Sequence, residues 1–305
     1  MDTTSKKLAE DINRLKTARR ALIVAHNYQR PEVQDVADFT GDSLELSRIA
    51  AQTDAEVIVF CGVNFMAETA KILSPAKTVI VPDPNAGCPL ANMVTPRQLQ
   101  EVKDRHPGAV VVCYVNSSAE TKALSDICCT SANAVQVVKS IDRDSEIIFV
   151  PDKSLGDYVS RRSGRELILW NGYCPTHHRI LPEDIEARRR EHPEAVVIVH
   201  PECLRPVVDM ADHVASTSGI VRLAKELDAC EFIIGTEIGI LHRLKKEAPG
   251  KEFYAASRLA DCPNMKLNDL PKILWALEDM TNKVELAADL IERARAPIEK
   301  MVAIG

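Results

Sequence analysis

The chain repeats one pattern three times, and this repetition constrains its fold more than any single motif does. Each repeat has an apolar run that ends in two polar residues one position apart, and equivalent positions lie 88 and then 86 residues apart. A hydroxyl residue follows 17 residues after the first polar residue of each pair. Such repetition indicates that one structural unit is used three times. The pairs are His26 and Tyr28, Tyr114 and Asn116, and His200 and Glu202, and the hydroxyl residues are Ser43, Ser131 and Thr217.

Each repeat continues with a second and a third apolar run, separated by segments whose apolar residues recur at intervals of three and four. Continuous apolar strands that alternate with amphipathic helices are typical of a parallel sheet covered on both faces. We therefore predict an α/β fold with three pseudo-symmetric small αβα domains, each with a short parallel sheet, around a central active site. The predicted domains are 1–94, 95–180 and 181–269, followed by a helical segment over 270–305.

The repeated polar residues point to one shared site. Ligands of parallel sheets bind at the carboxyl ends of the strands, and the polar pairs stand there. The hydroxyl residues stand where helices should begin, and a helix start offers free N–H groups and a positive dipole end to an anion such as a phosphate or a carboxylate. Ser, Thr and Asp residues also cap helices without binding any ligand, so both interpretations stay open.

Three of the nine cysteines share the repeat spacing, and each is followed directly by proline. Cys88, Cys174 and Cys262 lie 86 and 88 residues apart, which predicts three ligands to one metal centre. Three thiolates and a water could hold zinc, or three thiolates could hold a 4Fe-4S cube with one open iron. We interpret the other six cysteines as buried structural residues: Cys61, Cys113, Cys128, Cys129, Cys203 and Cys230.

Composition excludes several classes of partner. The net charge of −6 and the lack of a long Lys/Arg block give no reason to expect nucleic acid. The polar start of the chain does not resemble an export signal, and no run approaches the roughly 18 apolar residues of a membrane span. We therefore expect a cytoplasmic protein with no membrane contact. An odd number of cysteines also argues against a disulfide framework.

With these residues identified, the chain resembles the quinolinate synthase family, the iron-sulfur enzymes of de novo NAD synthesis. The resemblance runs over essentially the whole chain. It rests on motifs that occur in family order: "AHNYQRPEVQDVADFTGDSLELS", "GVNFMAETAKILSP", "PDPNAGCPLANM", "CYVNSSAETKALSDICCTSANAV", "WNGYCPTHHRILPEDI", "HPEC", "STSG", "GTEIGILHRLKKE" and "CPNMK".

The resemblance implies a reaction and a cofactor. It implies that iminosuccinate (iminoaspartate) condenses with dihydroxyacetone phosphate to give quinolinate, phosphate and water. It also implies one [4Fe-4S] cluster on Cys88, Cys174 and Cys262, whose open iron acts as a Lewis acid. An aspartate oxidase or dehydrogenase, which makes iminosuccinate, is the expected functional neighbour. Two alternatives are a zinc-dependent lyase or hydrolase on the same cysteines and a non-catalytic iron-sulfur sensor.

Two histidines beside Cys174, His177 and His178, could each contact a ligand or face solvent.

The resemblance also implies roles for the residues of the shared site. Some family members have a C-x-x-C pair at the third cysteine and many have a glycine before Ser-Thr-Ser, whereas this chain has Cys262 alone and Ala215. The implied catalytic residues are Glu202, His200, Tyr28, His26 and Tyr114, and the implied substrate-binding residues are His26, Ser43, Tyr114, Asn116, Ser131, His200, Glu202 and Thr217.

Overall fold

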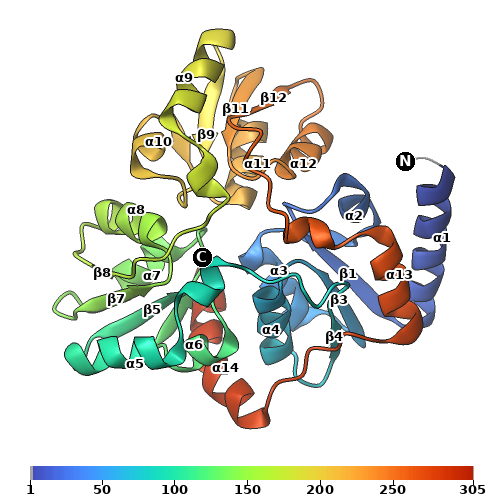
Figure 1. The fold of residues 1–305 in the computed structure, drawn as a ribbon, viewed down its shortest axis with the longest axis horizontal. Coiled ribbons are helices and arrows are strands. Elements are labelled where there is room, and N and C mark those ends of the chain that lie inside the picture. The colour runs from blue at the N-terminus through green and yellow to red at the C-terminus, as the bar shows by residue number, and fades with distance from the viewer. Residues whose placement is uncertain (1–2, 305) are drawn as a thin grey trace.

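The predicted α/β architecture is confirmed by the structure, a computed structural model that describes residues 3–304 (Figure 1). Three separate sheets are present, and each contains four parallel strands. Their orders are β2-β1-β3-β4, β6-β5-β7-β8 and β10-β9-β11-β12. The strands are β1 (Ala21–His26), β2 (Phe39–Gly41), β3 (Val57–Cys61), β4 (Thr78–Ile80), β5 (Val110–Tyr114), β6 (Ile127–Cys129), β7 (Ile147–Val150), β8 (Ile168–Leu169), β9 (Val196–Val199), β10 (His213–Val214), β11 (Glu231–Gly235) and β12 (Glu252–Ala255).

Helices and strands alternate in the same order in all three units, and each unit ends in a short 3-10 turn. The repeated sequence therefore folds as a repeated structure. The first unit has α1 (Thr3–Ala18), α2 (Pro31–Val36), α3 (Ser43–Gln52), α4 (Asn64–Leu73) and η1 (Leu90–Met93). The second has α5 (Pro96–Arg105), α6 (Ala119–Ala123), α7 (Ala134–Ser140), α8 (Lys153–Ser163) and η2 (His177–Arg179). The third has α9 (Pro182–Glu191), α10 (Arg205–Asp209), α11 (Thr217–Glu226), α12 (Ile240–Glu247) and η3 (Met265–Leu267).

Each sheet also has a fourth strand that the sequence did not predict. These edge strands, β2, β6 and β10, are two or three residues long, which is too short to produce a recognisable apolar pattern. Each lies beside the first strand of its unit, so that first strand pairs with the edge strand on one side and with the third strand of the unit on the other. One or two residues separate the end of this edge strand from the hydroxyl residue of the repeat.

Both faces of each sheet are buried, as the apolar strands require. In β1, Ile23 and Ala25 face a core formed with α1, α2 and α13 (Leu270–Asp279). Val24 points to the opposite face and joins a second core with α3 and α4, because successive side chains of a strand alternate between faces. This second core continues through the inner faces of all three sheets, which holds the units together around one centre.

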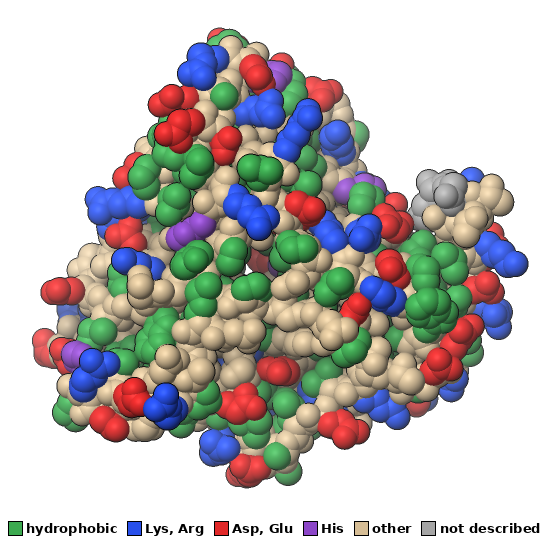
Figure 2. Space-filling view, viewed as in Figure 1, with side chains coloured by type: hydrophobic (Ala, Val, Ile, Leu, Met, Phe, Trp, Pro, Cys, Tyr) green, Lys and Arg blue, Asp and Glu red, His purple; other side chains and the backbone are tan. Residues whose placement is uncertain are grey.

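The C-terminal segment forms two helices that pack on the repeats. Helix α13 packs against α1 of the first unit, and α14 (Ala288–Ala303) packs against α4 of the first unit and α6 of the second. Figure 1 shows α14 in the space between these two units. Figure 2 shows a narrow opening on this face where the three lobes meet. Among residues 3–304, no helix is long and apolar enough to cross a membrane.

Candidate functional site

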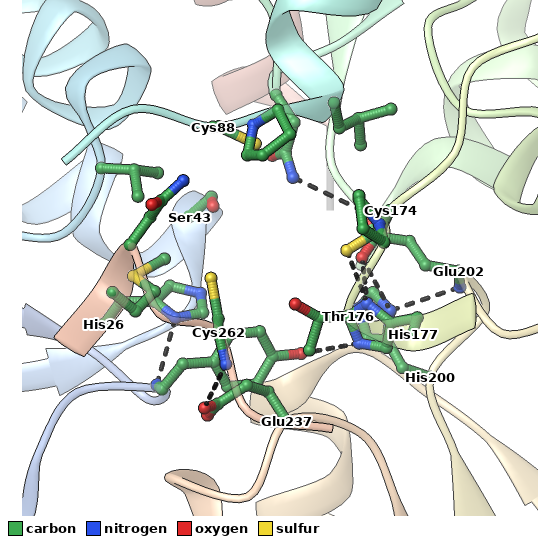
Figure 3. Close-up of a pocket in the computed structure, with 18 of the residues that line it drawn as sticks. His26, Ser43, Cys88, Cys174, Thr176, His177, His200, Glu202, Glu237 and Cys262 are labelled. Atoms are coloured by element: carbon green, nitrogen blue, oxygen red, sulfur yellow. Dashed lines mark hydrogen bonds and ion pairs between the residues drawn. The ribbon is translucent and has the colours of Figure 1, made fainter. Parts of the chain in front are cut away.

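The carboxyl ends of strands from all three sheets surround one central cavity of about 160 Å³. Its lining combines thiols, imidazoles, hydroxyls and carboxylates that are far apart in the sequence (Figure 3). All of the site residues predicted from the sequence line this cavity. They are His26, Tyr28, Ser43, Cys88, Tyr114, Asn116, Ser131, Cys174, His200, Glu202, Thr217 and Cys262.

The three cysteines that share the repeat spacing, Cys88, Cys174 and Cys262, are called the phased cysteines below. They occupy equivalent loops of the three units. Each lies between the last strand of its unit and the 3-10 turn, which begins two or three residues after the cysteine. The proline that follows each cysteine has no N–H group, so the next free N–H groups of the turn face the sulfur. The backbone N–H groups of Leu90 and Ala91 lie near the sulfur of Cys88 and act to lower the pKa of its thiol. The N–H of His177 does the same for Cys174, and those of Asn264 and Met265 do so for Cys262.

These thiols are half-buried and free, and their sulfur atoms approach the same space from three sides (Figure 3). Burial raises the pKa of Cys88 to about 12 and raises the pKa of Cys174 and Cys262 as well. Without a cation they are therefore neutral thiols near pH 7. A metal centre would supply the positive charge that thiolates need here, and the N–H groups aimed at sulfur would stabilise them further.

A network of short contacts joins the catalytic candidates of the first and third units through the buried side chain of His177. Its Nδ1 lies 2.7 Å from Oε2 of Glu202 and 3.2 Å from the sulfur of Cys174. Its Nε2 lies 2.8 Å from Oγ1 of Thr236, which is 2.5 Å from the hydroxyl of Tyr28. The contact with the carboxylate requires a proton on Nδ1, so Nε2 of a neutral ring accepts a hydrogen bond.

Glu202 is the charged centre of this network. Burial alone would raise its pKa, but the adjacent His177, with His200 and the Tyr114 hydroxyl, lowers the pKa of Glu202 to about 2. It therefore stays a carboxylate at neutral pH. Asn116 donates to Oε1 of Glu202 at 3.5 Å, so groups from the second unit also hold this carboxylate.

The two strand-end histidines stay neutral in this site. Burial lowers the pKa of His26 and of His200 to about 3. His200 stacks on His177 with ring centroids 4.6 Å apart, and its Nε2 lies 3.1 Å from the hydroxyl of Ser131. The ring of His26 lies edge-on to that of Tyr28 at 4.5 Å. Neutral imidazoles can donate and accept hydrogen bonds at the same time, which suits proton transfer without adding positive charge.

The hydroxyl residues begin helices in two of the three units. Helix α3 begins at Ser43 with Asp42 as its cap, and α11 begins at Thr217 with Ser216 as its cap. These caps accept hydrogen bonds from the first turns, which leaves fewer free N–H groups for an anion than the sequence predicted. In the second unit the prediction is wrong, because a turn separates Ser131 from α7.

The sequence did not show whether His177 or His178 faces the site, and the structure shows that only His177 does. His177 points into the cavity with only 1% of its surface exposed. His178 points away, stacks on Tyr173 at 4.7 Å and lies 2.9 Å from the hydroxyl of Ser154. Three further residues of the site show no pattern that repeats in all three units of the sequence: Thr236 and Glu237, which follow β11, and Arg179, which adds a cation to the cavity lining. Only the position of Thr236 and Glu237 at a strand end, and that of Arg179 five residues after Cys174, could have indicated them.

Five of the six cysteines outside the repeat spacing are buried, as predicted. Cys203 is among them, and its sulfur donates to the Gly235 carbonyl at 3.3 Å, away from the acid-base network. The prediction is wrong for Cys230, which is exposed. It directly precedes β11, at the outer end of the strand, where the buried pattern has not yet begun.

The chain is similar to known proteins over nearly its whole length. The family described as "Quinolinate synthetase A protein" matches residues 10–303. A quinolinate synthase of Desulforudis audaxviator is 54% identical over 300 residues, which cover 98% of this chain and 99% of the relative. Those of Methanoregula boonei and Methanosarcina barkeri are 53% and 52% identical, and cover 100% and 98% of both chains respectively. The chain therefore belongs to the quinolinate synthase family.

Proposed function

We propose that this protein condenses iminosuccinate with dihydroxyacetone phosphate to form quinolinate, phosphate and water. The observation that carries the proposal is the meeting of three phased thiols and the Glu202 network in one cavity. The family membership supports the same activity. Both substrates are small anions, and Arg179 supplies positive charge in the cavity lining.

We further propose that Cys88, Cys174 and Cys262 hold one [4Fe-4S] cluster. A single zinc ion with Zn–S bonds of about 2.3 Å needs its thiolates within about 4 Å of one another. In the described part of the chain, the one set of three possible ligands within 4.8 Å is Cys174, His177 and Glu202. The three cysteines are spread more widely, which favours a larger centre with one ligand from each unit. When bound, such a cluster supplies an open iron that acts as a Lewis acid on a substrate oxygen.

The protein groups supply the proton transfers that condensation and loss of water require. Glu202 is ionised and can accept a proton. Tyr28 keeps its proton, because burial raises the pKa of its hydroxyl well above the ordinary value. The contacts from Tyr28 through Thr236 and His177 to Glu202 form a continuous path between a donor and an acceptor. Ser43, Ser131 and Thr217 are the hydroxyls best placed to orient carboxylate or phosphate groups.

The activity is tested with anaerobically purified protein, dihydroxyacetone phosphate, and iminosuccinate generated in the reaction mixture. We expect quinolinate and free phosphate in equal amounts, and neither product when one substrate is omitted. Iron-loaded protein that forms no quinolinate from the two substrates would contradict the proposal.

A further inference from the structure

Glu237 is a second buried carboxylate of the cavity, and its contacts differ from those of Glu202. Its Oε1 accepts the backbone N–H of Cys262 at 3.1 Å, and its Oε2 accepts the N–H of Gly239 at 2.7 Å. Nζ of Lys266 lies 2.8 Å from Oε1. Figure 3 shows Glu237 beside Cys262 and joined to it. Oε1 therefore holds the Cys262 loop, and Oε2 holds the loop of Glu237 itself.

Lys266 extends these contacts to the first unit. Its ammonium group, besides pairing with Glu237, donates to the backbone carbonyl of Tyr28. In return, Nε of Arg30 donates to the carbonyl of Lys266 at 2.8 Å. The loop that carries the catalytic tyrosine is thus tied to the loop that carries the third cysteine. The side chain of Lys266 is only 17% exposed, so water competes weakly for its ammonium group and the link is strong.

The side chain of Gln34 ties the Tyr28 loop to the loop after β11, which carries Glu237. Its amide nitrogen donates to the carbonyl of Gln29 at 2.8 Å and to that of Gly239 at 2.9 Å. Gly239 has room for these contacts only because it lacks a side chain. A Cβ atom there would lie 2.6 Å from Nζ of Lys266 and 2.8 Å from Oε2 of Glu237, distances at which one of the atoms must move.

The equivalent position of the second unit is also a buried carboxylate. Asp152 lies 85 residues before Glu237, and each residue follows the third consecutive strand of its unit. Asp152 accepts the N–H of Leu155 at 2.7 Å and lies near the N–H of Cys174. In residues 3–304, however, no lysine or arginine pairs with Asp152, whereas Glu237 has Lys266. The link between a cysteine and the catalytic loop of another unit is thus a property of the third unit.

We propose that Glu237 is a positioning residue that, with Lys266, fixes the Cys262 loop against the Tyr28 loop. Glu237 then supports metal binding through its bond to Cys262, and it supports the placement of the Tyr28 hydroxyl through Lys266. The inference rests on the proposed function, which assigns Cys262 to the metal centre and Tyr28 to the reaction. Replacing a residue that holds a metal ligand in place typically lowers metal affinity or activity by roughly 10- to 100-fold.

The first test replaces Glu237 by glutamine, which keeps the size of the side chain and removes its charge. We expect the reconstituted Glu237→Gln protein to lose iron to a chelator roughly 10- to 100-fold faster than wild type. In the metal-free protein, we expect Cys262 to react faster with an alkylating reagent, located by mass spectrometry. The matched control is Asp261→Asn, because Asp261 is adjacent to Cys262 and 3.9 Å from Lys266 but is half exposed. The control should behave as wild type.

The second test removes only the contact that Lys266 makes between Glu237 and the Tyr28 loop. It can be carried out even if the Glu237→Gln protein does not fold. We expect Lys266→Met to keep its iron content, because the bond from Cys262 to Glu237 remains, and to lower kcat roughly tenfold with a small change in KM. Lys266→Arg, which keeps the cation, should recover most of the loss. Two results would overturn the inference: wild-type iron release and alkylation in Glu237→Gln, or unchanged kcat in Lys266→Met. A wild-type protein that binds no cluster would instead contradict the proposed function.

Discussion

Two buried carboxylates of the third unit, at the ends of β9 and β11, show how neighbours decide what an acid does. Glu202 is 3% exposed and Glu237 is not exposed at all. Burial acts on both in the same direction, yet the pKa of Glu202 is lowered to about 2 while that of Glu237 is raised to about 7. Two imidazoles and the Tyr114 hydroxyl surround Glu202 and overcome the effect of burial. For Glu237, burial outweighs the attraction of Lys266 and the backbone N–H groups.

The contacts of the two residues differ in the same way as their pKa values. Besides Asn116, the partners of Glu202 are His177, His200 and Tyr114, whose side chains can gain or lose protons, which suits acid-base chemistry. Those of Glu237 are two backbone N–H groups, which do not titrate, and one lysine. These contacts suit the proposed roles of Glu202 in proton transfer and of Glu237 in holding the site in place.

The largest expected effect comes from Glu202→Gln. This change keeps the shape of the side chain and removes the base, so kcat should fall by roughly 10² to 10⁴. Iron content should stay at the wild-type value, because Glu202 is not among the phased cysteines. Steady-state kinetics on protein of measured iron content tests this. A loss below tenfold would show that another group carries the proton transfer.

The pH dependence of stability should differ in sign between the two residues in metal-free protein. Because its folded pKa is lowered, Glu202 contributes stability above about pH 4.5, and this is lost as the pH falls toward 2. Because its folded pKa is raised, Glu237 contributes stability below about pH 4.5, and this is lost as the pH rises through 7. The second effect amounts to at most about 3 kcal/mol.

Urea unfolding of metal-free wild type and Glu237→Gln at pH 5 and pH 8 measures this effect. The free energy of unfolding of wild type should fall between these two pH values relative to that of the variant. If the free energies of unfolding of the two proteins changed by the same amount between these pH values, the pKa of Glu237 would not be raised in the way that distinguishes it from Glu202.

A smaller effect is expected at Thr236, whose hydroxyl contacts both Tyr28 and His177, because the Tyr28 hydroxyl also lies 3.3 Å from Nε2 of His177 directly. Thr236→Val keeps the volume and removes the hydroxyl, so kcat should fall roughly tenfold, as the loss of one buried hydrogen bond suggests. Ser154→Ala is the matched control, because Ser154 makes the corresponding contact with the outward-facing His178. Equal effects of the two changes would argue against a path through Thr236.

The smallest effect on the metal centre is expected at Cys203, next to Glu202 in the sequence. Its sulfur is buried and bonded to the Gly235 carbonyl. Cys203→Ala should therefore lower the free energy of unfolding by about 1 kcal/mol and leave the iron content unchanged. Thermal unfolding and an iron assay on the same sample test both statements. Iron loss in this variant would show that spacing along the repeats does not identify the ligands.

Spacing along the repeats predicted much of the fold and of the cavity lining. Equivalent sequence positions occupy equivalent places in a repeated fold, so His26, Tyr114 and His200 meet although they are far apart in the chain. The same reasoning could not find Thr236 or Glu237, because their chemistry is not repeated in the first unit. It also could not choose between His177 and His178, since the direction of each side chain is set by the turn after Cys174.

The short edge strands and the start of α7 were missed for a different reason. Two or three residues carry no measurable periodicity, so only pairing with the neighbouring strand defines β10. The turn at Ser131 depends on Asn133, whose side chain accepts from Thr130 and donates to the carbonyl of Met301 in α14. That contact joins distant parts of the chain, which local sequence does not reveal.

The central claim, that the three phased cysteines hold one cluster, is tested most directly by counting metal and sulfide. Anaerobically purified wild type should contain about four irons and four acid-labile sulfides per chain, as one cube requires. Cys88→Ala, Cys174→Ala and Cys262→Ala should each lose most of both, while Cys203→Ala keeps them. One zinc and no sulfide in wild type, or a full cluster in any of the three variants, would contradict the account.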